Sequence, residues 1–205
     1  MTKLLMVRHG ITETNATRQF TGQTDIDLNE EGYRQVEKLR DRLADEKIDI
    51  VYSSDLKRAL ITAEPISISH GIEIIRCPEL RELDYGECEG LTYREINDRY
   101  PELGRLIAEV NPEMRFPGGE CFQDLTDRAE KFIEIIKNQG EDEAILAVTH
   151  GGMLRILTCL LLGLEQSHWA SFRFDNASLS IIDIYPRRAI INLLNETSHL
   201  REIGG

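Results

Sequence analysis

The sequence predicts an α/β fold: a three-layer sandwich with a mostly parallel central sheet, one antiparallel edge strand and a small helical and loop cap insertion. Short segments rich in Ile, Val, Leu and Tyr alternate with longer segments whose apolar residues recur at helical spacing. Only residues 186–188 separate the last two strand-like segments, too few for a helical crossover. These two strands should therefore form an antiparallel hairpin at one edge.

The expected strands share short length and β-branched or aromatic composition. They are residues 3–8, 48–52, 72–76, 144–149, 179–185 and 189–194.

Four helices are expected between these strands. The first begins at Asn29, a good N-cap, and is followed by acidic residues that suit the start of a helix dipole. The second follows Ser54, with Asp55 in its first turn, and Pro65 should kink or end it. The third and fourth are expected over residues 122–138 and 152–162.

Residues 87–120 interrupt this alternation. They contain Tyr100-Pro101, Asn111-Pro112 and the run 116–119 (Phe-Pro-Gly-Gly), all of which favour turns. We expect short helices and loops that form a lid or cap on a single domain over residues 1–205.

Composition narrows the classes of partner. The net charge of −12 argues against binding to nucleic acid or to an anionic membrane surface. An anionic substrate would therefore need positive charge gathered locally. No apolar run is long enough for a membrane span, and no signal-peptide pattern precedes the first strand, so a cytoplasmic protein is expected. The four cysteines have no metal-ligand spacing, which predicts reduced thiols and no metal site.

Two strand ends carry a histidine followed by glycine. Arg8-His9-Gly10 ends the first strand, and His150-Gly151 ends the fourth. One such histidine alone is more often structural, but the pair favours a functional role. Ligands in open α/β sheets bind beyond the carboxyl ends of the strands, where both histidines would lie. Imidazole can act as a nucleophile or proton carrier near neutral pH, and arginine suits phosphate.

Two further segments are candidates for the same crevice. Arg58 lies about one turn into the second predicted helix, where a solvated arginine is the usual outcome. Glu82 begins an acidic stretch that would otherwise be interpreted as a solvated loop. Placed after strand 72–76, that stretch could supply one carboxyl group.

Together these motifs resemble the histidine phosphatase superfamily, which includes the phosphoglycerate mutase-like enzymes. The matching residues cover nearly the whole chain in the family's order: Arg8-His9-Gly10, Asn15, Thr21-Gly22, Ser53-Ser54, Arg58-Ala59, Glu82 before Tyr85-Gly86, and His150-Gly151.

The resemblance implies a role for each matched position. His9 would be the catalytic nucleophile that takes the phosphoryl group, and Glu82 the general acid. Arg8, Arg58 and His150 would surround the phosphate; His150, if protonated, would add a third cation. Asn15, Thr21 and Gly22 would bind phosphate or substrate. The family needs no metal and no organic cofactor for hydrolysis. Glu82 must be protonated to donate, a state that a negative substrate and partial burial favour.

Within the family, the sequence favours the phosphatase branch. Phosphoglycerate mutases have a basic segment after the acid residue, whereas residues 84–90 are acidic here and the cap has no paired arginines. Residues 20–22, 85–93 and 116–120 resemble α-ribazole phosphatases of cobalamin synthesis. Mutase activity and a non-catalytic binding or scaffold role stay as alternatives.

The expected partner is a small phosphorylated substrate. Two roles fit the aromatic residues Tyr93, Tyr100, Phe116 and Phe122 of the cap region: contact with a substrate ring, or packing of the cap against the sheet, which is the more usual role and the one we expect. Residues 160–162 and 169–172 fit either core packing or a homodimer contact.

Overall fold

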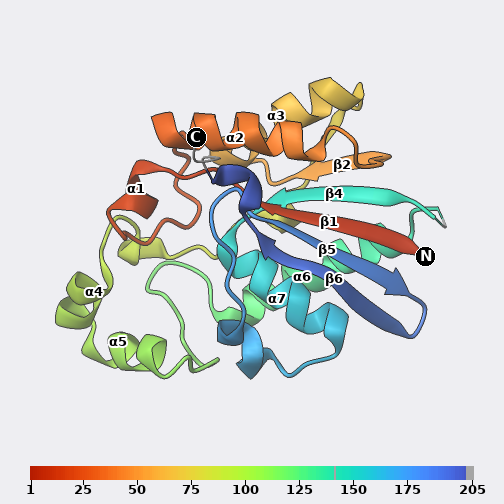
Figure 1. The fold of residues 1–205 in the computed structure, drawn as a ribbon. Coiled ribbons are helices and arrows are strands. Elements are labelled where there is room, and N and C mark those ends of the chain that lie inside the picture. The colour runs from red at the N-terminus through yellow and green to blue at the C-terminus, as the bar shows by residue number, and fades with distance from the viewer. Residues whose placement is uncertain (141, 202–205) are drawn as a thin grey trace.

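A six-stranded sheet lies between two layers of helices in the computed structural model, which describes residues 1–140 and 142–201 (Figure 1). The strands, in chain order, are β1 (Thr2–Arg8), β2 (Ile50–Ser53), β3 (Ile74–Arg76), β4 (Ala144–Thr149), β5 (Leu179–Tyr185) and β6 (Arg188–Glu196). Their spatial order is β3-β2-β4-β1-β5-β6. The α/β sandwich predicted from the sequence is confirmed.

The sheet is mixed, with both parallel and antiparallel pairs of strands. β3, β2, β4 and β1 are parallel neighbours, and β5 and β6 form the expected hairpin at one edge. β5 runs antiparallel to β1, and β6 runs antiparallel to β5. The strand that opposes the others is therefore β5, one position in from the edge.

Each face of the sheet is covered by a helix pair (Figure 1): α2 (Glu30–Leu43) with α3 (Lys57–His70), and α6 (Phe122–Lys137) with α7 (Gly151–Leu162). Successive side chains of β1 point to opposite faces of the sheet, so this strand contributes to the hydrophobic core on each face. Leu5 packs in the same cluster as the α2 and α3 residues, and Leu4 in the cluster of α6 and α7. Both leucines are fully buried, and burial of one such side chain stabilises the fold by about 1.5–3 kcal/mol.

The first turns of α2 and α3 differ. Asn29 caps α2 as predicted, because its side chain accepts a hydrogen bond from the Gly32 N–H at 2.9 Å. The predicted start of α3 is wrong: the helix begins at Lys57, and the Asp55 carboxylate instead pairs with Arg81 at 2.6 Å. The helix also continues through Pro65 to His70, where Gly71 ends it with a φ of 67°.

The segment predicted as a cap carries α4 (Tyr93–Arg99) and α5 (Pro101–Ala108) and lies at one end of the molecule, left in Figure 1. Its two ends meet. The Glu87 N–H donates to the Pro117 carbonyl, and the Glu120 N–H donates to the Asp84 carbonyl, each at 2.9 Å. A Cβ on Gly86 would lie 2.5 Å from the Gly119 nitrogen, so the backbones of these two segments are in direct contact.

The remaining helices are short: α1 (Glu13–Ala16) and four 3-10 turns at Pro78–Leu80, Gly86–Cys88, Gln166–Ser171 and Ser198–Leu200. Within the described ranges, no helix has both the length and the apolar character needed to cross a membrane. Leu160, Leu161, Trp169 and Phe172 are partly buried and pack against the larger core cluster, which favours core packing; a homodimer remains a prediction.

Candidate active site

The sheet brings the two histidines together. β1 and β4 are adjacent and parallel, with Arg8 opposite Thr149, so the next residues in each strand lie side by side. The His9 N–H donates to the Thr149 carbonyl at 3.0 Å, and the rings of His9 and His150 have centroids 5.1 Å apart. The pairing expected from the two strand ends is therefore confirmed.

The His9 ring is held in one tautomer. Its Nδ1 lies 2.7 Å from the Gly10 carbonyl oxygen, which can only accept, so Nδ1 carries the proton. Burial, followed by the charges of Arg58 and Arg8, holds the pKa of His9 well below its usual range. The ring is therefore neutral, and Nε2 keeps an available lone pair.

The backbone around His9 is also fixed. The Gly10 N–H donates to Thr62 Oγ1 at 3.0 Å, and a Cβ on Gly10 would lie 2.9 Å from the Gly32 carbonyl oxygen. Only glycine permits this approach without a shift of the backbone. The Asn176 amide and the Ala177 N–H each donate to the His9 carbonyl at 3.1 Å.

His150 is fully buried at the N-cap of α7. Its Nε2 forms a 2.8 Å hydrogen bond with Ser54 Oγ, whereas its buried Nδ1 has no partner among the described residues. Burial, then Arg58 and His9, hold the pKa of His150 well below its usual range. The imidazole of His150 is thus neutral in this structure. It is not the third cation that we considered from the family resemblance.

Arg8 and Arg58 supply the positive charge. Arg8 donates to the Phe174 carbonyl at 2.7 Å, and Arg58 donates to the carbonyls of Thr24 and Gly22 at 2.9 and 2.5 Å. Burial lowers the pKa of both arginines, and the Glu82 carboxylate opposes that shift. The Nε atom of each is buried without a partner among the described residues.

Glu82 lies where α7 begins. Its carboxylate accepts hydrogen bonds from the N–H groups of Leu83 at 3.0 Å and Gly152 at 2.9 Å. A Cβ on Gly152 would lie 2.3 Å from Glu82 Oε1, so this glycine makes room for the carboxylate. The acidic segment that begins at Glu82 is therefore not a solvated loop: it is anchored at the crevice, with Glu82 only 7% exposed.

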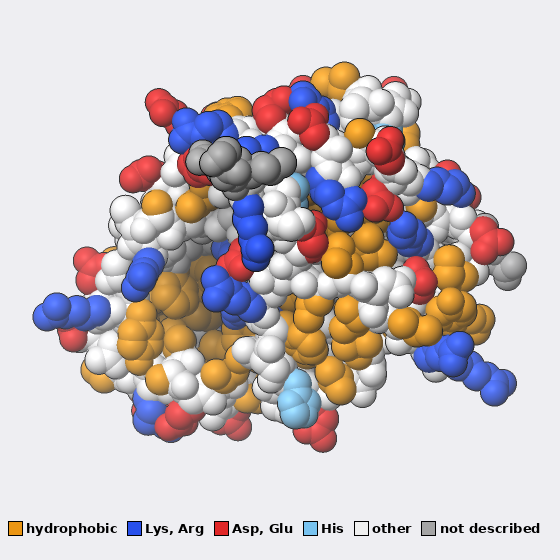
Figure 2. Space-filling view, in the orientation of Figure 1, with side chains coloured by type: hydrophobic (Ala, Val, Ile, Leu, Met, Phe, Trp, Pro, Cys, Tyr) orange, Lys and Arg blue, Asp and Glu red, His pale blue; other side chains and the backbone are white. Residues whose placement is uncertain are grey.

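A cleft of about 480 Å³ opens beside these groups, and Arg8, Glu82, Gly151 and Gly152 form part of its wall. Figure 2 shows a hollow with hydrophobic side chains on the side of the molecule that carries α4 and α5. The other lining residues include apolar or aromatic ones and two further arginines: Phe20, Leu83, Tyr85, Ile107, Val110, Met114, Phe116, Trp169, Phe174, Arg18 and Arg155.

Of the four aromatic residues singled out in the cap region, Phe116 lines this cleft. Phe122 is buried against Trp169, with ring centroids 5.1 Å apart. The hydroxyl groups of Tyr93 and Tyr100 donate to Gly104 and Glu87 and do not reach the cleft.

The three residues expected to contact substrate differ in position. Asn15 and Thr21 line the cleft, and Asn15 Oδ1 also accepts from the Asn176 amide at 3.1 Å. Gly22 does not line it. Its carbonyl holds Arg58, and a Cβ on Gly22 would lie 2.4 Å from the Leu83 carbonyl oxygen. Gly22 therefore shapes the loop behind the arginine.

Sequence reasoning missed the roles of four residues. Ser54 matched the family motif but received no role, and Thr62 gave no signal. Asn176 begins an Asn-Ala-Ser triplet, a pattern typical of glycosylation acceptors, and gave no other signal. Arg155 follows Gly151 by four residues in α7, so helical periodicity could have placed it on the same face.

The arrangement suits a tetrahedral anion. Arg8 Nε, Arg58 Nε and His150 Nδ1 are buried polar atoms without partners in the described part of the chain, and all three belong to residues around His9. Each unmade hydrogen bond of this kind costs about 1–3 kcal/mol, which an anion with several acceptor oxygens would recover. Over residues 1–140 and 142–201, no group of three His, Cys, Asp or Glu side chains is placed to hold a metal ion.

Comparison with known proteins gives consistent matches. The family model of the histidine phosphatase superfamily (branch 1) matches residues 4–197. The chain is 36% identical to phosphoserine phosphatase 1 of Hydrogenobacter thermophilus, over 98% of this chain and 96% of that one. It is 35% identical to a metal-independent phosphoserine phosphatase of Arabidopsis thaliana, over 100% and 85%. The α-ribazole phosphatase structure from Shigella flexneri superposes with a TM-score of 0.88 at 29% identity, covering 95% and 96%.

Proposed function

Because the chain belongs to the histidine phosphatase superfamily, and is thus a phosphoric monoester hydrolase, we propose that it acts without a metal ion through a phosphohistidine on His9. One observation carries this proposal: a neutral histidine with a free Nε2 lies among buried polar atoms of Arg8, Arg58 and His150 that have no partner among the described residues. Phosphoryl transfer asks a protein mainly for positioning and charge stabilisation, which these groups supply.

In the first step, the Nε2 lone pair of His9 attacks phosphorus as the bond to the ester oxygen breaks. The Gly10 carbonyl keeps the ring oriented and accepts the hydrogen bond from Nδ1–H as the imidazole gains positive charge. Arg8 and Arg58 hold the equatorial oxygens. Glu82, as the general acid, gives a proton to the leaving oxygen and becomes a carboxylate.

In the second step, water attacks the phosphohistidine. Glu82 accepts the proton of the water, His9 leaves as the neutral ring, and phosphate is released. Each oxygen of the Glu82 carboxyl group accepts one backbone hydrogen bond. Each oxygen therefore keeps a second lone pair, which can bind the proton that Glu82 gives up in the first step and takes up in the second.

The first candidate substrate is α-ribazole 5′-phosphate. The apolar and aromatic wall of the cleft, with Phe20, Tyr85 and Phe116 in mutual contact, suits a ring system. A volume of about 480 Å³ is within the range of small-molecule sites. The similarity to the α-ribazole phosphatase of Shigella flexneri adds support.

Phosphoserine is the second candidate, and Arg155 is the observation that favours it. Arg155 lines the cleft, stacks over Trp169 at 5.4 Å from the ring centroid, and has a buried Nε without a partner among the described residues. A substrate carboxylate could pair with this guanidinium. The two relatives named phosphoserine phosphatases point the same way.

Phosphoglycerate mutase activity is the weaker alternative. The basic segment that follows the acid residue in phosphoglycerate mutases has no counterpart at the cleft, because the arginines of residues 87–120 face surface carboxylates. Arg94, Arg99, Arg105 and Arg115 each lie within 4.0 Å of an acidic side chain, and none lines the cleft. A non-catalytic scaffold would not need the buried, unpartnered donors around His9.

The test is phosphate release from a panel of esters after treatment with a chelator: α-ribazole 5′-phosphate, phosphoserine, 3-phosphoglycerate and 2,3-bisphosphoglycerate, each with the wild type and His9→Ala. Chelator-resistant release that His9→Ala abolishes supports the proposal, and the ester with the highest kcat/KM identifies the substrate. Interconversion of phosphoglycerates without release would indicate a mutase. Silence in both assays would indicate a scaffold.

A further inference from the structure

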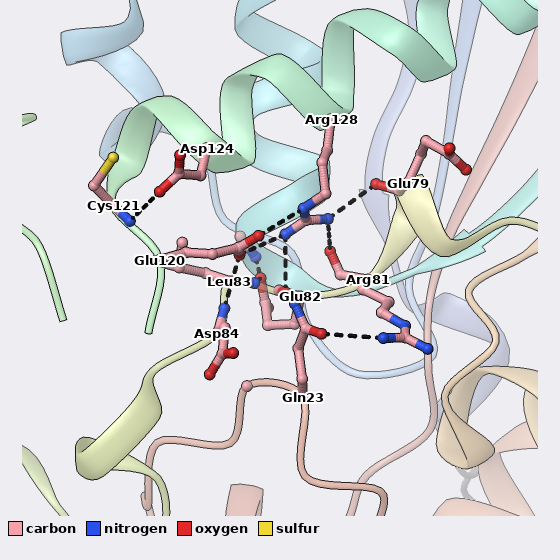
Figure 3. A network of polar contacts seen from close by, with 12 residues as sticks. Gln23, Glu79, Arg81, Glu82, Leu83, Asp84, Glu120, Cys121, Asp124 and Arg128 are labelled. Carbon is pink, nitrogen blue, oxygen red and sulfur yellow. Dashed lines mark hydrogen bonds and ion pairs between the residues drawn. The ribbon is translucent and has the colours of Figure 1, made fainter. Parts of the chain in front are cut away.

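Arg128 of α6 is bonded to the segment that carries Glu82 without reaching the cleft (Figure 3). Its Nη1 donates to the carbonyls of Glu79 at 3.0 Å and Arg81 at 2.7 Å, and its Nη2 donates to the Glu82 carbonyl at 3.0 Å. These three carbonyls lie within four consecutive residues. The guanidinium therefore fixes the backbone on the N-terminal side of the Glu82 carboxyl group and at Glu82 itself.

Glu120 completes this arrangement. Its carboxylate accepts from Arg128 Nε at 3.0 Å and from Nη2 at 2.8 Å, and it also accepts from the Asp84 N–H at 2.9 Å. Asp84 lies two residues after Glu82, so the Arg128–Glu120 pair holds the chain on both sides of the carboxyl group. The five guanidinium N–H groups thus meet five acceptors, an arrangement that lysine, with three donors, cannot reproduce.

The local fold explains why such a pair is needed. Residues 77–85 lie outside the sheet, and a single 3-10 turn, Pro78–Leu80, is their regular structure. The carbonyls of Glu79, Arg81 and Glu82 instead bond to Arg128, whose side chain is 16% exposed. A charge-assisted pair with good geometry loses little to solvent at this burial.

We infer that Arg128 and Glu120 are positioning residues for Glu82: their pair holds the Glu82 carboxyl group where it meets the leaving oxygen of the substrate. This inference rests on the proposed function, in which Glu82 protonates that oxygen. Neither residue touches the substrate, because neither lines the cleft. Displacement of a catalytic group by about 1 Å can lower a rate by about 100-fold.

The test compares two esters that differ in their need for an acid. An alkyl phosphate such as phosphoserine needs its leaving oxygen protonated, whereas p-nitrophenyl phosphate releases a stable anion and needs little help. In Arg128→Lys and Glu120→Gln we expect kcat/KM for the alkyl ester, which reports the steps up to departure of the leaving group, to fall by about 10- to 100-fold. The kcat/KM for p-nitrophenyl phosphate should fall by about threefold or less, because hydrolysis of the phosphohistidine, which Glu82 also assists, does not enter this ratio.

The double variant should lose no more than the worse single variant, because the two side chains act as one unit. Arg42→Lys is the matched control: Arg42 is a partly buried arginine of α2, away from the cleft, and it pairs with Glu46 and with Glu196 of β6. It should leave the ratio of the two kcat/KM values unchanged. If Arg128→Lys does not fold, Glu120→Gln, which keeps the side-chain shape, carries the test.

Equal losses on the two esters, or no loss, would overturn the inference and assign the pair a structural role alone. Glu82→Gln separates this outcome from failure of the proposed function. If Glu82→Gln loses activity selectively on the alkyl ester while the Arg128 and Glu120 variants do not, the proposed function stands and the inference fails. If Glu82→Gln shows no selectivity, the acid role of Glu82 fails, and the inference with it.

Discussion

The carboxylate of Glu82 and the backbone of Gly152 occupy adjoining space: the Gly152 nitrogen lies 2.9 Å from Oε2, and a Cβ on Gly152 would lie 2.3 Å from Oε1. The first turn of α7 thus both bonds the carboxylate and leaves room for it. The place of Glu82 depends on a missing side chain as much as on a hydrogen bond.

Gly152→Ala should therefore displace Glu82. We expect kcat for an alkyl phosphate to fall by about 10- to 100-fold with a small change in KM, because the phosphate pocket itself is unaltered. Steady-state kinetics measure this. Gly163→Ala at the other end of α7 is the control: its φ is 66° and no atom lies within 4 Å of a new Cβ, so it should cost stability and spare kcat. An unchanged kcat in Gly152→Ala would contradict the prediction.

The nucleophile can be identified by trapping. Wild-type protein mixed with a ³²P-labelled ester and quenched in alkali should retain label that acid removes, since a phosphorus–nitrogen bond is acid-labile. His9→Ala should retain none, because the proposed mechanism makes His9 Nε2 the attacking atom. His70→Ala is a suitable control, as His70 ends α3 away from the cleft and its ring bonds the carbonyl of Leu43 on α2. Label that persists in His9→Ala would place the nucleophile elsewhere.

Thr62→Val should destabilise the protein by about 1–3 kcal/mol, because the buried Gly10 N–H loses its acceptor. Thr158→Val is closely matched: both threonines are buried and donate to the carbonyl four residues earlier in a helix, at 2.7 Å. No N–H group of residues 1–140 or 142–201 donates to the Thr158 hydroxyl. Urea denaturation should therefore show the larger loss for Thr62→Val, and equal losses would contradict this assignment.

Stability should fall on acidification because of His9 and His150. Burial lowers the pKa of both rings in the folded state, whereas the unfolded chain takes up protons near pH 6.5. Below that pH the unfolded state binds more protons, so the free energy of unfolding decreases as pH falls from about 7 to 5. Each histidine contributes up to about 1.4 kcal/mol per pH unit.

The double variant His9→Asn/His150→Asn removes both titrating rings, so its free energy of unfolding should fall less steeply over the same range. Chemical denaturation at several pH values measures both slopes. Parallel slopes for the wild type and the double variant would show that the two rings are protonated in the folded state as readily as in the unfolded one.

The sequence predicted the pairing of His9 with His150 because parallel neighbouring strands end at the same edge, a relation that needs no side-chain detail. It could not identify the Gly10 carbonyl as the acceptor for Nδ1, because that contact depends on a ring rotamer and on one backbone turn. It also left Arg58 open, since an arginine near a helix start is usually solvated, whereas here two carbonyls from residues 22–24 enclose it.

The start of α3 was misplaced for a related reason. Asp55 is a good first-turn residue by propensity, but the tertiary pair with Arg81 withdraws it from the helix. Arg128 gave no signal either, because its five acceptors come from two segments distant from it in the sequence, residues 79–82 and Glu120. Such convergence is a property of the folded chain alone.

The segment of residues 87–120 leaves the body of the protein and returns to it at one place, where Glu87 bonds Pro117 and Glu120 bonds Asp84. A segment closed in this way can change in length at small cost, since doubling a loop adds about 0.6 kcal/mol of closure entropy. The wall that Ile107, Val110, Met114 and Phe116 contribute to the cleft therefore varies independently of the strand ends that hold His9 and His150. Changes confined to residues 87–120 can therefore alter which substrate the cleft accepts, while the residues that surround the phosphate stay the same.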